Sequence, residues 1–212
     1  MKKLLLIVLP LLLIVGCSKP ISEETLIDKD GLKYHPETKE LYSGKVFKNY
    51  MGGGKEFEGS YMEGEKDGLW TIFWENGQKK SEETYKDGKK DGPLTRWYSS
   101  GQIEKEETYK DGKRFGLRTD YYESGVKYKE INYREGSIVE WYDHYTEWYE
   151  NGQKRIFRTY QPPRNSNIKQ EGDGSEYFHW WYENGQKRTE TINKDGRIIS
   201  TKSWNEDGSV KE

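Results

Sequence analysis

Residues 85–108 read YKDGKKDGPLTRWYSSGQIEKEET, and this stretch is one complete unit of a pattern that recurs along the chain. Its tyrosine returns every 24 residues, and three sets of glycines keep the same step. The tyrosines are Tyr61, Tyr85, Tyr109 and Tyr133, and the glycines are Gly64, Gly88, Gly112 and Gly136, then Gly68, Gly92 and Gly116, then Gly77, Gly101 and Gly125. A unit this short cannot bury its own apolar face, so neighbours must stack, and the sequence predicts an elongated repeat array.

Each unit contains two strand-length segments separated by glycine turns. Asn76-Gly77 and its later counterparts are strong hairpin signals, because both residues tolerate the positive φ of a type I′ turn. We therefore expect each unit to be one β-hairpin. The predicted fold class is all-β, an elongated single-layer antiparallel sheet of tandem β-hairpin repeats.

Alternation along each strand assigns side chains to the two faces of this sheet. One face carries threonines and aromatic residues at equivalent positions of three repeats: Thr71, Thr95, Thr119, Phe73, Trp97 and Tyr121. The other face carries Ile72, Arg96 and Asp120. Stacked aromatic and β-branched residues support sheet pairing, so we expect the first face to be the core and the second to be charged and solvated.

The composition by itself is also typical of disordered segments, since 34% of the residues are charged and aliphatic residues are few. Disordered chains do not hold Tyr, Trp and Gly at a fixed period, so we expect a folded array. The period lengthens between Gly125 and Gly152, and again between Gly152 and Gly185. The second excess falls near residues 161–175, whose Pro, Gly, Asn and Ser content predicts a loop insertion.

The N-terminus carries the features of a secretion signal. Two lysines precede an apolar stretch over residues 4–15, which is shorter than the roughly 20 apolar residues that a membrane-spanning helix needs. The motif at residues 14–17, Ile-Val-Gly-Cys, resembles the lipobox of bacterial lipoproteins, in which the cysteine is diacylated and becomes the new N-terminus. The alternative is a signal peptide with an incidental cysteine. We expect a signal peptide over 1–16, a tether lipidated at Cys17 over 17–30, and the repeat array over 31–212.

Acyl chains on Cys17 would anchor the body to a membrane of the cell envelope. The residue after the cysteine, Ser18, is not an aspartate. By analogy with known lipoprotein sorting signals, this favours the outer membrane. Cys17 is the only cysteine, so no internal disulfide can form. Cleavage removes two lysines and no acidic residue, so the net charge moves from −2 to −4. A mixed charge pattern without a basic face makes nucleic acid an unexpected partner.

The motifs Tyr-x-x-Gly, Asp-Gly and Trp-Tyr-x-Asn-Gly-Gln-Lys carry a family resemblance. Residues 181–187, WYENGQK, show the last motif in full. At these positions the chain resembles the MORN-variant repeats of bacterial proteins, many of them identified as YwqK-family antitoxin components, and the resemblance covers nearly all of residues 31–212. It implies an array of β-hairpins used for binding, with an antitoxin-like role.

No group of residues in the sequence points to catalysis. Carboxylate pairs such as Glu82-Glu83 recur with the repeat, which favours a solvated strand face, and a thin sheet offers little burial with which to raise a pKa. Residues 28–31, Asp-Lys-Asp-Gly, superficially resemble part of a calcium loop, but we interpret them as a turn. The histidines stand in no motif with a nucleophile or a metal ligand: His35, His144 and His179. We expect no enzymatic activity, no cofactor and no metal site.

One row of aromatic residues is the candidate site. By repeat register, the sequence predicts that five residues form a line along the sheet: Phe73, Trp97, Tyr121, Trp148 and Trp181. They can be the core, or part of the row can remain exposed as a contact surface, since aromatic residues are enriched at binding hot spots. Two functions follow. The first is an envelope lipoprotein that binds another envelope or secreted protein as a scaffold, an adhesin-like protein or an immunity factor. The second is a glycan- or peptidoglycan-binding module that stacks sugars on the same rings.

Overall fold

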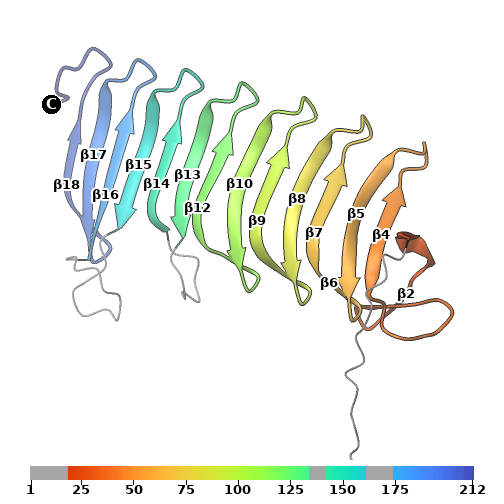
Figure 1. Ribbon diagram of the computed structural model, residues 1–212. Coiled ribbons are helices and arrows are strands. Elements are labelled where there is room, and N and C mark those ends of the chain that lie inside the picture. The colour runs from red at the N-terminus through yellow and green to blue at the C-terminus, as the bar shows by residue number, and fades with distance from the viewer. Residues whose placement is uncertain (1–18, 134–141, 161–173) are drawn as a thin grey trace, which may run out of the picture.

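A computed structural model describes residues 19–133, 142–160 and 174–212 of the chain. Within these residues one 16-stranded sheet forms nearly the whole molecule, and its strands follow one another in chain order (Figure 1). The strands of this sheet are β1 (Ile21–Ser22), β4 (Gly44–Asn49), β5 (Lys55–Met62), β6 (Glu65–Lys66), β7 (Gly68–Phe73), β8 (Lys79–Lys86), β9 (Lys89–Trp97), β10 (Ile103–Lys110), β11 (Lys113–Arg114), β12 (Gly116–Tyr121), β13 (Lys127–Tyr133), β14 (Tyr142–Trp148), β15 (Lys154–Tyr160), β16 (Ser175–Trp181), β17 (Lys187–Lys194) and β18 (Arg197–Ser203).

The predicted all-β, single-layer array of hairpins is confirmed. Each repeat contributes one antiparallel hairpin, such as β7–β8 or β9–β10, and consecutive hairpins pair side by side along the sheet (Figure 1). The exception to the antiparallel pattern is β1, which pairs with β4 in parallel. In the described part of the chain, no helix has the length and apolar composition that crossing a bilayer requires.

Two kinds of turn join the strands, one along each long edge of the sheet (Figure 1). Along one edge, two-residue turns connect successive hairpins. Asp87 and Gly88 there have φ of 46° and 73°, the two positive angles that a type I′ turn requires. Along the other edge, the turn is longer and closes with hydrogen bonds from Gly77 N–H to the Trp74 carbonyl (2.9 Å) and from Trp74 N–H to the Gln78 carbonyl (2.8 Å).

Type I′ geometry therefore belongs to the Asp-Gly turns, and its assignment to the Asn-Gly pairs was wrong. Gly77 has φ of 83°, whereas Asn76 is not among the described residues with positive φ. In the longer turn, the left-handed backbone conformation is needed only at Gly77. The two strands accommodate the extra turn length by a shift of their pairing register between Ile72 and Phe73. Asn76 instead accepts a hydrogen bond from Gln78 N–H (3.0 Å) through its side chain and donates one to the Ser99 carbonyl of the next hairpin (2.9 Å).

The apolar core lies on the face that the sequence analysis expected to be solvated, so that expectation was wrong. We call this the core face, and it carries Trp70, Leu94 and Ile131, all buried. Trp70 lies flat against the neighbouring strand, where a Cβ at Gly59 would come within 2.3 Å of the Trp70 Cδ2 atom. A glycine on β5 thus makes the space in which the largest core side chain packs.

Charged residues complete the core face. Glu83, Glu107, Asp120 and Glu147 are buried there, on strands that also carry lysine, arginine and tyrosine side chains. Long cationic stems and tyrosine rings cover this face where a second layer of structure would otherwise be needed. Of the carboxylate pair Glu82-Glu83, which the sequence analysis expected on a solvated strand face, Glu83 therefore belongs to a buried ion-pair layer, whereas Glu82 lies on the opposite face and is only half-buried.

The N-terminal end of the sheet carries a small cap. The segment 19–30 falls within the predicted tether, and in the structure it contains β1, the 3₁₀ helix η1 (Glu23–Thr25) and β2 (Ile27–Lys29), which pairs with β3 (Leu32–Tyr34). Leu26 packs in the main hydrophobic cluster with Val46 and Trp70. These elements cover the first hairpin, so the edge of the sheet at this end is not bare.

The core assignment predicts an unequal response to the loss of two tryptophans. Trp70→Ala should lower the free energy of unfolding by about 3–5 kcal/mol, because it empties a buried site, whereas Trp97→Ala on the opposite face should cost clearly less because that ring is only half-buried. Urea unfolding followed by circular dichroism measures both. A larger loss for Trp97→Ala than for Trp70→Ala would contradict the placement of the core.

Candidate functional site

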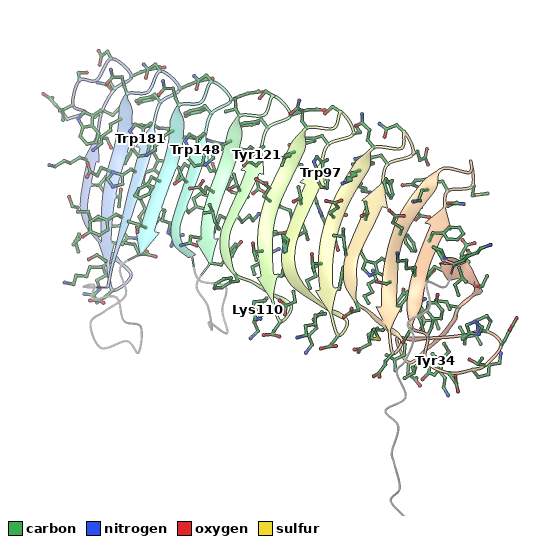
Figure 2. All side chains as sticks on the ribbon, in the orientation of Figure 1. Tyr34, Trp97, Lys110, Tyr121, Trp148 and Trp181 are labelled. Atoms are coloured by element: carbon green, nitrogen blue, oxygen red, sulfur yellow. The ribbon has the colours of Figure 1, made fainter. Side chains whose placement is uncertain are left out.

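The five aromatic residues singled out from sequence do form one row, on the face opposite the core. We call this the aromatic face. Figure 2 shows four of them, Trp97, Tyr121, Trp148 and Trp181, in a line near the edge that carries the longer turns. The fifth, Phe73, occupies the same register in β7. All five are half-buried, so the row is neither a sealed core nor a fully open surface.

Lysine side chains cover several rings of this row. Within a hairpin, each aromatic residue stands opposite a lysine, as Trp148 does opposite Lys154, except that Ile103 stands opposite Trp97. In several repeats the lysine reaches over the ring of the next repeat at 5.7 Å from Nζ to ring centroid: Lys55 over Phe73, Lys79 over Trp97, and Lys127 over Trp148. Such cation–π contacts contribute about 0.5–1 kcal/mol at exposed sites.

The same lysines are fixed by carboxylates three residues later in the strand. Lys55 Nζ lies 2.6 Å from Glu58 Oε2, and Lys127 Nζ lies 2.7 Å from Glu130 Oε2. Each lysine is therefore held between a carboxylate of its own strand and a ring of the next repeat. The arrangement links neighbouring repeats and shields one side of each covered ring from solvent.

Tyr121 and Trp181 depart from this pattern. The residue that would cover Tyr121 is Ile103, and the Tyr121 hydroxyl donates instead to Glu106 Oε2 (2.9 Å). Burial and this hydrogen bond raise the pKa of Tyr121 to about 12. Trp181 stacks on His179, with ring centroids 5.8 Å apart, and burial lowers the pKa of that histidine.

A second aromatic row was missed by the sequence analysis, although its signal was present, because an aromatic residue directly follows each of the five residues of the first row. Its members donate side-chain hydrogen bonds to the backbone carbonyl of the first-row residue in the next repeat. The bonds are Tyr50 Oη to Phe73 O (2.6 Å), Trp74 Nε1 to Trp97 O (3.2 Å), Tyr98 Oη to Tyr121 O (2.7 Å), Tyr122 Oη to Trp148 O (2.9 Å), Tyr149 Oη to Trp181 O (3.0 Å) and Tyr182 Oη to Trp204 O (3.0 Å). This second row bonds each repeat to the next.

An exposed apolar stripe on the aromatic face was also missed. Leu69, Pro93 and Leu117 each follow the second glycine of a repeat, and they keep the 24-residue step. Each of the three lies two residues before a threonine of the aromatic face. The strand register pairs Thr84 with Leu69 and Thr108 with Pro93, so one threonine lies between neighbouring members of this row. Leu69 is 55% exposed and Leu117 is 49% exposed. We call these three residues the apolar stripe.

The buried carboxylates of the core face are satisfied by several partners each. Glu107, whose side chain is 1% exposed, accepts from Lys105 Nζ (2.7 Å) and from Arg114 Nε (3.1 Å). Burial alone would raise the pKa of Glu107, but the hydrogen bond and charge of Lys105, with Arg118 and Arg114, outweigh it and lower that pKa below its usual value of 4.5. The pKa of Glu83 is lowered in the same way, against its own burial, by the Tyr85 hydroxyl and Lys90.

Other candidate positions lie elsewhere. Cys17 and residues 161–173 of the predicted loop insertion are outside the described residues. Asp30 and Gly31, read from sequence as a turn, have φ of 54° and 79°, which is the geometry of a type I′ turn. Within the described ranges, no three or more His, Cys, Asp or Glu side chains are grouped closely enough to hold a metal ion.

Fold and surface together define a single-layer array of β-hairpin repeats, the architecture of a repeat-based binding scaffold. Three segments match the family model described as the MORN repeat variant, at residues 66–87, 90–111 and 116–135. Each match begins and ends around one hairpin, β7–β8, β9–β10 or β12–β13. No curated protein matches the chain.

The lowered pKa values predict acid-sensitive folding. Because the folded pKa of Glu107 lies below the unfolded value, its stabilisation is complete above the unfolded pKa and is lost as the pH falls through the folded pKa. The contribution of Glu107 to the urea midpoint should be level from pH 7 to about 5.5 and fall below about pH 4.5, while the lowered pKa of His179 adds a separate decline as the pH falls below about 6.5. Glu107→Gln should cost about 1–3 kcal/mol at neutral pH and reduce the fall in acid.

The control for this experiment is Glu106→Gln, one residue away on the aromatic face and exposed to solvent. It should change the midpoint at neutral pH much less than Glu107→Gln does. Equal effects of the two substitutions, or an acid transition that Glu107→Gln leaves unchanged, would contradict a stabilising role for the buried carboxylate.

Proposed function

We propose that this chain is a lipid-anchored protein of the bacterial cell envelope whose aromatic face binds another protein. The observation that carries the proposal is the apolar stripe, because its leucines are about half exposed on a flat sheet face that no other described element covers. Scattered exposed leucines need no explanation, but a row repeated at a fixed step gives a partner one continuous line of contact.

The extended shape of the aromatic face, which runs across many strands of one sheet, favours a protein partner over a small molecule. Its hydrogen-bonding groups are already engaged, as in the Lys55–Glu58 and Lys127–Glu130 pairs. What it offers a partner is apolar area at the stripe, bordered by paired charges that set orientation, which is the usual make-up of a protein interface with an apolar centre and a polar rim.

The glycan alternative uses the aromatic row, and the lysines weigh against it. A sugar stacks on the face of an aromatic ring, and Lys55, Lys79 and Lys127 each lie over such a face. Binding a sugar there would require each lysine to leave both its ring and its carboxylate. The apolar stripe, in contrast, carries no cationic cover.

Envelope location and role follow from the N-terminus and the family resemblance. Lipidation at Cys17 and release of residues 1–16 would place the array at a membrane surface, the outer membrane in a cell that has one. In that position a binding array serves as a scaffold, as an adhesin-like protein, or as an immunity factor of the YwqK type that meets a toxin in the envelope. We propose a binding role without enzymatic activity.

The stripe predicts a selective loss of partner binding. A leucine side chain buried in an interface contributes about 1.5–3 kcal/mol, so the double variant Leu69→Ser, Leu117→Ser should weaken binding about a hundredfold or more. The measurement is crosslinking of the lipidated protein in cells, identification of the crosslinked protein, and titration of that purified partner against the purified chain.

The matched control is Ile198→Ser, which removes an exposed apolar side chain of β18, distant from the stripe in the sheet order. It should leave binding unchanged, and circular dichroism should show all variants folded. Retained binding by the double variant would exclude the stripe. Recovery of glycan fragments alone, with binding lost in Trp97→Ala, would support the glycan alternative instead.

Lipidation predicts release by one substitution. Cys17→Ser removes the acylated thiol, so the protein should move from the membrane fraction to the soluble fraction while the array stays folded. Fractionation with immunoblotting measures this. A Cys17→Ser protein that remains in the membrane fraction would contradict the proposed anchor.

A further inference from the structure

The core face contains a shallow hollow within the repeat array, away from the apolar stripe. It has a volume of about 480 Å³ and is formed by β7, β8, β9 and β10. Apolar, cationic, acidic and small polar side chains contribute to its lining: Ile72, Trp74, Lys80, Arg96, Glu104 and Ser81.

The hollow exists because Ser81 is small. Across the strands, Ser81 stands between Ile72 and Arg96, and the next residue along this row is Lys105. One repeat later, the position of Ser81 is taken by Lys105, and two repeats later by Lys129. Ser81 is 3% exposed and forms the floor, while the longer side chains around it form the walls.

Two cations at this hollow form no hydrogen bond or ion pair with a carboxylate among the described residues, although the charge of Arg96 acts on Glu83 and helps to lower the pKa of that carboxyl. Arg96 stands directly opposite Lys105, a like charge, and Lys105 is engaged with Glu107 at 2.7 Å. Within the described residues, no hydrogen bond or ion pair joins the Arg96 guanidinium to a carboxylate. Lys80 is exposed, and its Nζ lies 4.4 Å from the centroid of the Trp74 ring. Like charges opposite each other across strands are unfavourable, so an anion placed here would relieve a local repulsion.

The apolar wall is held in a fixed orientation. Trp74 Nε1 donates to the Trp97 carbonyl at 3.2 Å, which orients its ring, and Ile72 lies beside it in the lining of the hollow. An anion-binding group next to an aromatic and a branched aliphatic side chain fits a ligand that carries a carboxylate beside an apolar group.

The carboxylates at the hollow narrow the choice of ligand. Glu83 is already held by the Tyr85 hydroxyl (2.6 Å) and by Lys90 (3.2 Å). Glu104 has no such partner among the described residues, and it would repel a dianion such as phosphate. A ligand with one negative charge and a nearby N–H donor suits both Arg96 and Glu104.

We propose that this hollow binds the C-terminal residue of a polypeptide. The terminal carboxylate pairs with the Arg96 guanidinium through two parallel hydrogen bonds and with Lys80, the terminal side chain packs on Ile72 and Trp74, and the terminal backbone N–H donates to Glu104. The site stands on the core face and does not depend on the apolar stripe, so each can fail without the other.

The test uses the full chain and a fluorescein-labelled peptide, Gly-Ser-Gly-Ser-Leu, with a free C-terminal carboxylate. Its matched partner is the same peptide with an amidated C-terminus, and binding is followed by fluorescence anisotropy. We expect the acid to bind and the amide to bind at least about tenfold more weakly, since a hydrogen-bonded charge is lost. Arg96→Gln should weaken binding of the acid by a similar factor, while Lys113→Gln, an exposed cation of the two-residue turn edge, should not.

Each other outcome overturns the proposal in a defined way. Equal binding of acid and amide, or no binding of the acid at millimolar concentration, removes the carboxylate site. Unchanged binding by Arg96→Gln places any binding elsewhere. An amidated peptide ending in glutamate that binds as well as the acid would assign the site to an acidic side chain and exclude a chain terminus. Partner capture through the apolar stripe is unaffected by any of these results.

Discussion

The hydrogen bond from the second aromatic residue of one repeat to the backbone carbonyl of the next is the contact on which the array depends. A single-layer sheet has no second layer to fix the spacing and twist of its hairpins. Tyr98 donating to Tyr121, and Tyr149 donating to Trp181, connect turns that strand pairing alone would leave separate. Asn76 adds a bond from the same turn to the next one. These hydrogen bonds connect neighbouring turns along one edge of the sheet. They fix the spacing of the hairpins, and the regular rows of side chains on both faces depend on that spacing.

On the core face, charged side chains compensate for the lack of a second layer of structure. Burying an isolated carboxylate is costly, but Glu83 and Glu107 each receive a tyrosine hydroxyl two residues later in the same strand and the charge of a nearby cation, Lys90 from the next strand for Glu83 and Lys105 from the same strand for Glu107. The stems of the lysines and arginines cover apolar surface at the same time. Ion pairs and aromatic rings therefore do in this sheet what an opposing layer of aliphatic side chains does in a sandwich. Few aliphatic residues are needed, which explains how a chain with this composition folds.

The two faces consequently offer different chemistry to partners. On the aromatic face lysine–carboxylate pairs engage the charged groups of several strands and the apolar stripe is the part left open, which suits a broad protein contact. On the core face several carboxylates are paired with cations, whereas at the hollow around Ser81 the Arg96 guanidinium forms no described hydrogen bond or ion pair with a carboxylate and lies near a fixed tryptophan ring. The hollow arises where Ser81 departs from the repeat, whereas the apolar stripe keeps the step of the repeat.

The sequence alone determined the period, the hairpin in each repeat, the single layer and the alignment of Phe73, Trp97, Tyr121, Trp148 and Trp181, because a fixed step and two-residue alternation fix which side chains share a row. It could not decide which face is the core. Alternation yields two sets of residues without ranking them, and Glu107 reads as a solvated carboxylate until Lys105, Arg114 and Tyr109 are seen to enclose it. Only the tertiary structure decided burial, because burial here depends on how long side chains of the same strand and of neighbouring strands close over each carboxylate.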